Sequence, residues 1–349
     1  MNPPGTVLVT GSRGYLGSCL VPECRARGWR TAGLDCGLYD AEGGPALPEP
    51  DVEMRLDVRD VAAGDLRGVG VVLHAAAYST DPLGEAFPDA AREVNVAGTA
   101  RLADAARDAG VSRFVLVSTA GAYAPAGDAW SDESSPMEGV TVYRRSKIAA
   151  EAEVLARRGP GFEVLVVRLP TLYGDAPSLR LDLAVNGLVR RAVAGGPLEL
   201  HGDGRQWRPL GHVRDVARLL ADAAVAPLDR LDGPVVNACT EAMNHRVAEM
   251  VLRVARAFPG IEVVRRPPGP GGGASFRVRS VRLPVLLPAF APSFTLDDAI
   301  VELRRRWESG PPRGEALEAC TRAPFLARRI AAGRLDANGR HVVLASPEG

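Results

Sequence analysis

The chain has 349 residues, of which 46% are hydrophobic and 24% charged, a composition that predicts a globular protein with a large core. Lys and Arg together number 42, as do Asp and Glu, so no net field recruits nucleic acid or an anionic membrane. The five cysteines show no metal-ligand spacing, and their odd number argues against a disulfide framework. No apolar run approaches the roughly 18 residues of a membrane span, and the first expected strand starts by Thr6, which leaves no room for a signal peptide. We therefore expect a cytoplasmic protein that binds no metal, nucleic acid or membrane.

Strand-like and helix-like segments alternate through the first half of the chain. The expected strands cover residues 7–10, 29–35, 52–58, 71–75, 113–118 and 162–168, and the expected helices 15–27, 88–109 and 143–156. Repeated βα units of this length predict an α/β fold, a doubly wound parallel sheet of the Rossmann type with right-handed crossovers.

The pattern is less regular after Thr171. We expect helices at 182–194, 213–224, 244–258, 296–309 and 313–332, and a short strand at 198–201. Asn244 is the expected N-cap of its helix, and Thr295 with Asp298 forms an expected capping box. The second half therefore predicts a smaller C-terminal α/β lobe, with a cleft between it and the sheet.

Three glycines, Gly11, Gly14 and Gly17, interrupt the pattern where the first strand gives way to the first helix. Such a passage brings backbone N–H groups against a phosphate at a helix N-terminus. The glycines alone are a weak signal, but with the residues below they predict a dinucleotide-binding domain over 1–174, to which parts of 205–240 return. Residues 175–349 would form mostly the substrate-binding lobe and C-terminal helices.

Asp35 lies 18 residues after Gly17, at the end of the second expected strand. A carboxylate there accepts hydrogen bonds from the adenosine ribose and repels a 2′-phosphate, which favours NAD over NADP. Arg13, inside the glycine turn, is a counter-signal because its guanidinium could meet a 2′-phosphate. We expect NAD, with NADP as the alternative.

Tyr143 and Lys147 are four residues apart on one expected helix, so both side chains can point into one site. A phenol with an ordinary pKa near 10 is a poor base at neutral pH, and a nearby ammonium lowers that pKa toward the working range. The pair occurs by chance in many helices, but here it follows the glycine turn and Asp35 at consistent intervals. We therefore expect Tyr143 to be the catalytic acid/base and Lys147 to support it.

Two hydroxyl residues, Ser118 and Thr119, stand at the end of the fifth expected strand. A hydroxyl at the C-terminal end of a parallel strand faces the cofactor crevice and can hydrogen-bond a substrate hydroxyl or carbonyl. Thr119 is our candidate for this catalytic role, and Ser118 is the alternative and a cofactor contact.

With these residues assembled, residues 7–307 resemble the extended short-chain dehydrogenase/reductases, and more narrowly the NAD-dependent nucleotide-sugar epimerase/dehydratase family. Further matching pieces are Asp57-Val58, His74-Ala-Ala-Ala77, Asn95-Val-Ala-Gly-Thr99, Arg168-Leu-Pro-Thr-Leu-Tyr-Gly174 and Gly202-Asp-Gly-Arg-Gln-Trp-Arg208. The resemblance implies cofactor contacts from Tyr15, Leu16, Asp57, Val58, Ala75, Ala76, Ala77, Asn95 and Pro170, and substrate contacts from Thr171, Asn186 and Arg208. Arg208 matches the arginine that grips the nucleotide diphosphate, and a guanidinium can bind a phosphate through two hydrogen bonds.

The chain departs from the family pattern at positions that bear on the reaction. The 4,6-dehydratases carry Asp and Glu directly after the hydroxyl residue, as acid and base of water elimination, where this chain has Ala120 and Gly121. The related decarboxylases keep the Glu, and Gly121 stands at that position in this chain. Thr171 replaces the usual Asn, and Pro209 replaces the common Asp after the gripping arginine. The chain therefore lacks the side chains that dehydration requires.

The leading hypothesis is NAD-dependent epimerisation of a nucleotide-activated sugar at C4, through a transient keto-sugar. One alternative is an NAD(P)H-dependent ketoreductase or dehydrogenase that acts on a nucleotide sugar. Another is a catalytically silent cofactor-binding protein, because fold does not determine function. The resemblance also implies a homodimer. His201, His212 and His245 have no spacing that places them around the cleft, so we interpret them as structural or surface residues.

Overall fold

Seven parallel strands form the central sheet of the computed structural model, which describes residues 3–268 and 275–342. From edge to edge the sheet contains β11 (Val235–Asn237), β7 (Glu163–Leu169), β5 (Arg113–Thr119), β4 (Val69–His74), β1 (Thr6–Thr10), β2 (Thr31–Leu34) and β3 (Val52–Met54). The strand order reverses between β1 and β4, and ligands of doubly wound sheets bind in the crevice at such a switch point. The predicted fold class is confirmed.

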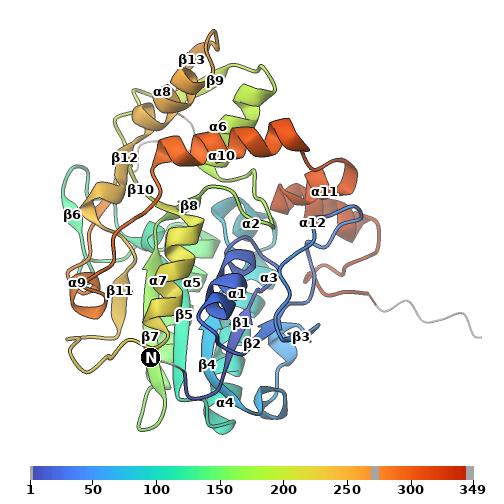
Figure 1. The fold of residues 1–349 in the computed structure, drawn as a ribbon, viewed down its shortest axis with the longest axis vertical. Coiled ribbons are helices and arrows are strands. Elements are labelled where there is room, and N and C mark those ends of the chain that lie inside the picture. The colour runs from blue at the N-terminus through green and yellow to red at the C-terminus, as the bar shows by residue number, and fades with distance from the viewer. Residues whose placement is uncertain (1–2, 269–274, 343–349) are drawn as a thin grey trace, which may run out of the picture.

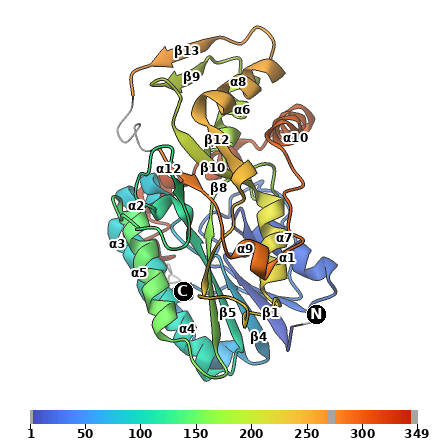
Figure 2. The same ribbon diagram turned by 90° about the vertical axis from the view of Figure 1, so that its left-hand side faces the viewer.

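Helices cover both faces of this sheet (Figure 2). One face carries α1 (Gly17–Ala26) and α7 (Val213–Ala223); the other carries α2 (Asp81–Ala86), α3 (Pro88–Arg92), the π-helical η3 (Glu93–Gly98), α4 (Thr99–Asp108) and α5 (Val142–Ala156). Alternate strand residues serve the two layers: Val7 and Val9 pack toward α1 and α7, whereas Leu8 packs toward α4. The helix expected over 88–109 is therefore helical throughout, but with a π-helical middle.

A second lobe stands over the carboxyl ends of the strands (Figure 1). Its strands are β8 (Thr171–Tyr173), β10 (Trp207–His212) and β12 (Asn244–Arg246) in one sheet, β9 (Leu198–His201) with β13 (Val263–Arg266), and β6 (Trp130–Ser131) with β14 (Arg277–Val278). Its helices are α6 (Ala184–Val193), α8 (Val247–Ala257) and α10 (Leu296–Ser309); the short α9 (Leu283–Leu286) and the 3₁₀ turns η1 (Val58–Asp60), η2 (Ala63–Leu66), η4 (Ala120–Ala122) and η5 (Glu241–Met243) join the elements of the chain.

The segment after α10 returns to the first lobe. It forms α11 (Gly314–Ala319) and α12 (Arg322–Ala331), so the single helix expected over 313–332 is two helices separated by Cys320 and Thr321. Figure 1 shows both beside the blue loop that leaves β2. Leu326 and Leu335 are buried in the core beneath that loop.

Two further expectations had different outcomes. The predicted capping box is confirmed, because Thr295 accepts the backbone N–H of Asp298 and the Asp298 carboxylate accepts that of Thr295. The predicted cap at Asn244 is wrong, since α8 has Arg246 at its N-cap. The Asn244 amide instead donates to the carbonyl oxygens of Thr240 and Val278, which draws it into β12.

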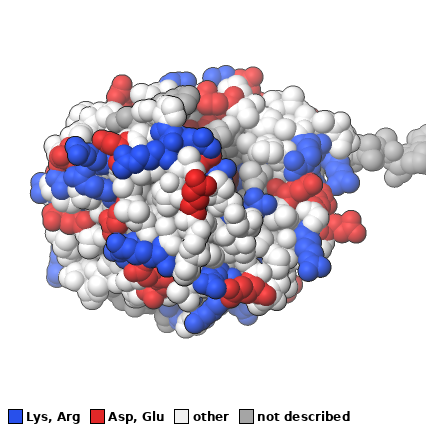
Figure 3. All heavy atoms as spheres, turned by 90° about the horizontal axis from the view of Figure 1, so that it is seen from above, with Lys and Arg blue, Asp and Glu red and all other residues white. Residues whose placement is uncertain are grey.

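Positive and negative side chains lie side by side on the face drawn in Figure 3. No extended area of one sign covers this face, in keeping with the equal numbers of acidic and basic residues. Among residues 3–268 and 275–342, no helix has both the length and the apolar run to cross a membrane.

Candidate active site

A cavity of about 390 Å³ opens at the switch point, between the carboxyl ends of the strands and the second lobe. The structure brings most of the predicted residues together on its wall: Gly11, Gly14, Tyr15, Leu16, Gly17, Asp35, Asp57, Val58, Ala75, Ala76, Ala77, Ser118, Thr119, Tyr143, Lys147, Pro170, Thr171 and Arg208. Arg13, Asn95 and Asn186 lie outside the lining.

The glycine turn leaves no room for a side chain at Gly11 or at Gly17. Gly11 has φ +67°, and a Cβ on it would lie 2.9 Å from the backbone of Ala76. A Cβ on Gly17 would lie 2.0 Å from the carbonyl oxygen of Gly11, so only glycine lets α1 approach the turn. The N-terminus of α1 therefore faces the cavity directly, which is the arrangement that receives a dinucleotide pyrophosphate.

Asp35 lies at the end of β2, on the cavity wall. Its carboxylate accepts the backbone N–H groups of Gly37 (2.8 Å) and Arg13 (3.1 Å). Burial raises the pKa of this carboxyl, and these two hydrogen bonds oppose that rise. The groups fix the carboxylate where a ribose would meet it, so the residues present fit NAD.

The Arg13 guanidinium points away from the cavity. Its Nε donates to Asp40 at 2.8 Å, and its Nη1 lies 3.3 Å from a carboxylate oxygen of Glu53. Two carboxylates therefore neutralise the charge that made a 2′-phosphate an alternative, which weakens the argument for NADP.

Asp57 and Val58 reach the wall near Asp35, but the Asp57 carboxylate is already engaged. It accepts from the Nε and Nη2 of Arg59, at 2.9 and 2.7 Å. Although burial acts to raise it, the pKa of Asp57 is lowered by these bonds from Arg59. The same guanidinium donates to the carbonyl oxygen of Asn338, far along the chain.

Thr119, Tyr143 and Lys147 meet on the opposite wall of the cavity. Thr119 ends β5, whereas Tyr143 and Lys147 lie one turn apart on α5, which Thr141 caps by accepting the backbone N–H of Arg144. The Lys147 side chain is buried. The expected Thr–Tyr–Lys set therefore surrounds one space.

The charge states of this set differ from the expectation. Burial raises the pKa of the Tyr143 phenol to about 12, although a hydrogen bond with Thr119 acts to lower this pKa. Burial also lowers the pKa of Lys147 to about 8, and the charge of Glu151 opposes that fall. The expected lowering of the phenol pKa is therefore not present, because both groups lose hydration in the cavity.

A buried polar network lies behind Lys147. Glu151, one turn further along α5, accepts the Ser118 hydroxyl at 2.5 Å and two donors of the Arg168 guanidinium. Arg168 also donates to the Tyr123 hydroxyl at 2.8 Å. The network fixes Ser118 from behind and sets a negative charge beside Lys147.

Asn95 and Asn186 use their amides inside the protein. Asn95 accepts the backbone N–H of Tyr78 at 2.8 Å and donates to Ser146 at 2.9 Å. Asn186 is fully buried and bonds to both the N–H and the carbonyl oxygen of Gly174. The structure therefore brings neither of these expected ligand contacts to the cavity; both amides instead hold its walls together.

Several lining residues were not anticipated. Tyr39, Arg180 and Arg322 form one end of the cavity, and Arg144 and Phe276 lie toward Arg208. Arg144 follows Tyr143 directly and could have been found from that motif. The others follow no motif, because loops and a distant helix bring them in.

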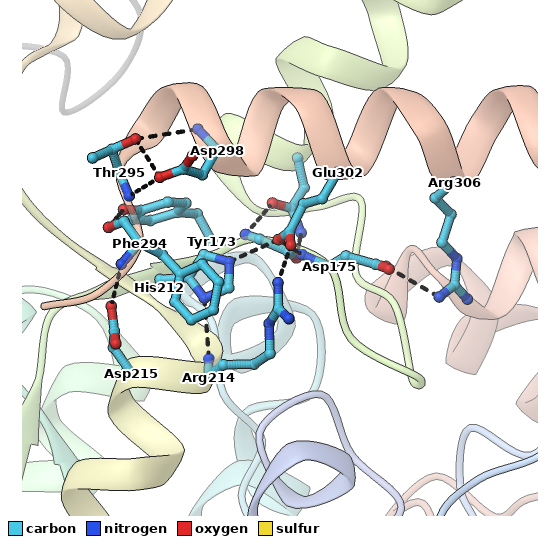
Figure 4. Close-up of polar contacts among 12 residues, drawn as sticks. Tyr173, Asp175, His212, Arg214, Asp215, Phe294, Thr295, Asp298, Glu302 and Arg306 are labelled. Carbon is cyan, nitrogen blue, oxygen red and sulfur yellow. Dashed lines mark hydrogen bonds and ion pairs between the residues drawn. The ribbon is translucent and has the colours of Figure 1, made fainter.

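His212 belongs to a separate network (Figure 4). Its Nε2 lies 2.7 Å from Glu302 of α10, and its ring stacks on Phe294 at 4.2 Å. Glu302 also accepts the backbone N–H of Asp175 and a donor of Arg214. His212 is outside the cavity lining and ties α10 to the strand β10 that carries Arg208.

The model of the NAD dependent epimerase/dehydratase family matches residues 7–239, about two thirds of the chain. The chain belongs to this family. The predictions of the family, of an enzyme and of NAD as its cofactor are confirmed at this level. Among residues 3–268 and 275–342, no cluster of His, Cys, Asp and Glu could hold a metal ion.

Curated relatives match the chain over part of its length. A UDP-glucose 4-epimerase of Mycolicibacterium smegmatis is 29% identical over 222 residues, 60% of this chain and 70% of that protein. A 4-hydroxy-2-methyl-3-oxo-4-farnesyl-3,4-dihydroquinoline-1-oxide ketoreductase of Stigmatella aurantiaca is 34% identical over 169 residues, 48% of this chain and 50% of that protein. The chain spans 65% and 50% of the first two curated relatives it matches.

Solved structures match over more of the chain. MoeE5 in complex with UDP-glucose and NAD has a TM-score of 0.75 at 29% identity, and the match covers 87% of this chain and 99% of MoeE5. Other family relatives, at about a quarter identity, are named decarboxylases and dehydratases. The family therefore includes several reactions, and the residues of this chain must distinguish among them.

Proposed function

We propose that the protein catalyses NAD-dependent epimerisation of a nucleotide-activated sugar, at C4 and through a transient keto-sugar. One observation carries this proposal. Thr119, Tyr143 and Lys147 surround one cavity, and the next wall residue after Thr119 is Gly121, which has no acid or base. The site can thus move a hydroxyl proton but offers no side chain there for eliminating water.

In this reaction the Tyr143 Oη removes the proton from the sugar hydroxyl and later returns it. Thr119 hydrogen-bonds the same oxygen and orients it toward the phenol. The glycine turn and Asp35 would hold NAD, whose nicotinamide would supply the hydride acceptor and donor for oxidation of the sugar carbon and its reduction on the other face. Cofactor contacts come from the predicted lining residues, including Ala75, Ala76, Ala77 and Pro170.

Lys147 supplies the positive charge that this proton transfer needs. Because the phenol pKa is about 12, Tyr143 must first release its own proton to solvent before it can act as the base, and the Lys147 ammonium would stabilise the phenolate that then accepts the hydroxyl proton. The Lys147 pKa of about 8 leaves the ammonium charged at pH 7 and neutral above about pH 8. Activity is therefore expected below that pH.

Arg208 and Thr171 would bind the substrate. Arg208 lies on the lining with its guanidinium over the ring of Phe276, 5.5 Å from the ring centroid. Burial lowers the pKa of Arg208, and a diphosphate would offset that loss of hydration. Asn186 would act indirectly, by holding the loop that carries Arg180.

A ketoreductase acting on a nucleotide sugar is the second candidate, because one relative with 34% identity is named a ketoreductase, although the substrate in its name is a dihydroquinoline oxide and not a sugar. The two reactions differ in stoichiometry. A reductase consumes one reduced cofactor per product, whereas an epimerase exchanges configuration with no net change.

The test is a panel of UDP-, GDP-, CDP- and dTDP-sugars, with and without added NAD(H) or NADP(H), followed by nicotinamide absorbance and product stereochemistry. Exchange of configuration without cofactor consumption supports the epimerase, and turnover only with reduced cofactor supports the reductase. Y143F should reduce turnover by about 10²- to 10⁴-fold, as expected for loss of an acid/base. Y173F removes a phenol outside the cavity and should leave turnover unchanged. Full activity of Y143F would contradict Tyr143 as the acid/base, and no turnover of the wild type across the whole panel would favour the silent protein.

We also propose that the protein is a homodimer, as the family resemblance implies, and that it works in the cytoplasm. Light scattering of the purified protein tests the dimer. A monomeric mass at micromolar concentration would contradict it.

A further inference from the structure

Arg322 is a buried arginine on the cavity wall to which neither the sequence motifs nor the comparisons give a role. It is the first residue of α12, only 4% exposed, and it lines the cavity at the end where Tyr39 and Cys36 follow Asp35. Its guanidinium lies over the Tyr39 ring, 4.0 Å from the ring centroid. It therefore reaches the cavity from the far end of the described chain.

The guanidinium of Arg322 lacks an acidic partner within the described ranges. It donates to the carbonyl oxygen of Ala319 and to the Ser178 hydroxyl, both at 3.0 Å. The neighbouring carboxylate of Asp182 is engaged by both Nε and Nη2 of Arg180, at 2.9 and 2.8 Å. Burial lowers the pKa of Arg322, which Tyr39 and Asp182 oppose and Arg180 reinforces.

A short chain of contacts links Arg322 to the glycine turn. The Ser178 hydroxyl that Arg322 contacts belongs to a residue whose backbone N–H donates to Ser18 at 3.2 Å. Ser18 is the second residue of α1, whose N-terminus faces the cavity. The guanidinium and the positive end of α1 thus line the same cavity, and an anion bound there would be stabilised by both.

The segment that delivers Arg322 is fastened along the adenosine side of the site. Arg329 donates to the carbonyl oxygen of Asp40 at 2.6 Å, and Glu315 accepts the backbone N–H of Glu42. Further along, His341 bonds to the carbonyl oxygen of Cys36 at 2.8 Å. The segment therefore lies across the loop that follows β2, beside the position expected for the adenosine.

We propose that Arg322 binds the pyrophosphate of the dinucleotide together with the glycine turn, so that residues 314–341 clamp the cofactor in place. The chemistry that Arg322 recognises is a diphosphate, which the substrate also carries. The position beside Tyr39 and Cys36 assigns it to the cofactor, whereas Arg208 serves the substrate. This inference rests on the NAD site of the proposed function, but not on the sugar reaction.

Calorimetric titration with ADP-ribose, adenosine and UDP tests the assignment without turnover. R322Q should weaken ADP-ribose by about tenfold or more, the usual effect of losing a charged hydrogen bond, and adenosine by less than twofold. R328Q is the matched control, since Arg328 lies on the same helix, is half exposed and pairs with Glu318. Its affinities should equal those of the wild type.

Three results would overturn the proposal: unchanged ADP-ribose binding in R322Q, an equal loss for adenosine and ADP-ribose, or a loss confined to UDP, which would assign Arg322 to the substrate. If R322Q does not fold, amide hydrogen exchange of the wild type decides instead. ADP-ribose should slow exchange in α12 and adenosine should not; equal effects contradict the clamp. Absence of sugar epimerisation would leave all these readings intact.

Discussion

Lys147 is the residue at which burial and charge compete most directly. Burial lowers its pKa from 10.5 to about 8, and Glu151 works in the opposite sense. The ammonium is therefore present below about pH 8 and lost as the pH rises through that value. Since the Tyr143 phenolate depends on this charge, we expect the activity to fall as the pH rises through about 8.

Removal of the Glu151 charge should move the alkaline limb of kcat/KM to lower pH. In E151Q the Lys147 pKa falls further, because the one charge that raises it is gone. E153Q is the control, since Glu153 lies on the same helix and pairs with Arg157 instead. A limb that stays in place in E151Q, or that moves equally in both variants, would contradict the role given to Lys147.

A methyl group at Gly17 should damage both the turn and the fold. The added Cβ meets the Gly11 carbonyl oxygen at 2.0 Å, and relief requires α1 to move away from β1. We expect G17A to lose about 1–3 kcal/mol of unfolding free energy and to bind NAD weakly, as measured by urea denaturation and calorimetry. G64A, where no atom lies within 4 Å, should change stability by less than about 0.5 kcal/mol.

At the scale of elements, α10 is tied to β10 and α7 through the Glu302 carboxylate. This carboxylate lies 2.7 Å from the Nε2 of His212, accepts the backbone N–H of Asp175 at 2.7 Å and pairs with the Arg214 guanidinium (Figure 4). Since β10 also carries Arg208, this contact sets the position of the substrate side of the cavity.

E302Q should therefore loosen the second lobe. We expect a loss of about 1–3 kcal/mol in unfolding free energy, because three donors lose their charged acceptor. E308Q is the control on the same helix, because Glu308 is 55% exposed and pairs with Arg304. This substitution should cost less than about 0.5 kcal/mol. Equal unfolding free energies of the two variants would show that the contacts of Glu302 do not stabilise the second lobe.

The elements that the sequence predicted well are those with a local pattern. Apolar strands followed by glycine or hydroxyl residues identified β1, β5 and the turn before α1, and the four-residue spacing placed Tyr143 and Lys147 on one helix. The direction of Arg13 could not be predicted in this way. It depends on Asp40 and Glu53, which only the folded loop and β3 bring near.

At the scale of the whole molecule, the two lobes meet around one cavity, so a ligand there should stabilise both together. NAD at 100 times its dissociation constant should raise the unfolding free energy by about 2.7 kcal/mol, in a single shifted transition. Thermal denaturation followed by circular dichroism checks this. Two transitions, of which only one moves, would mean that the lobes unfold independently.

Long-range contacts also mark the limit of prediction for the molecule as a whole. The family pattern ended near residue 307, and a helix was expected beyond it, but nothing local indicated that Arg322 lines the cavity. Its contacts to Tyr39 and Ser178 join residues that lie more than a hundred positions away. Such contacts leave no periodic trace in a single sequence.

The path of residues 314–341 has a consequence for how the protein comes to hold its cofactor. The glycine turn leaves the ribosome early, whereas Arg322 emerges only after both lobes have been synthesised. A chain that lacks residues 314–341 would thus present an open half-site on the adenosine side. If Arg322 binds the pyrophosphate as proposed, tight binding of the cofactor would therefore require the chain through α12 and its contact at His341.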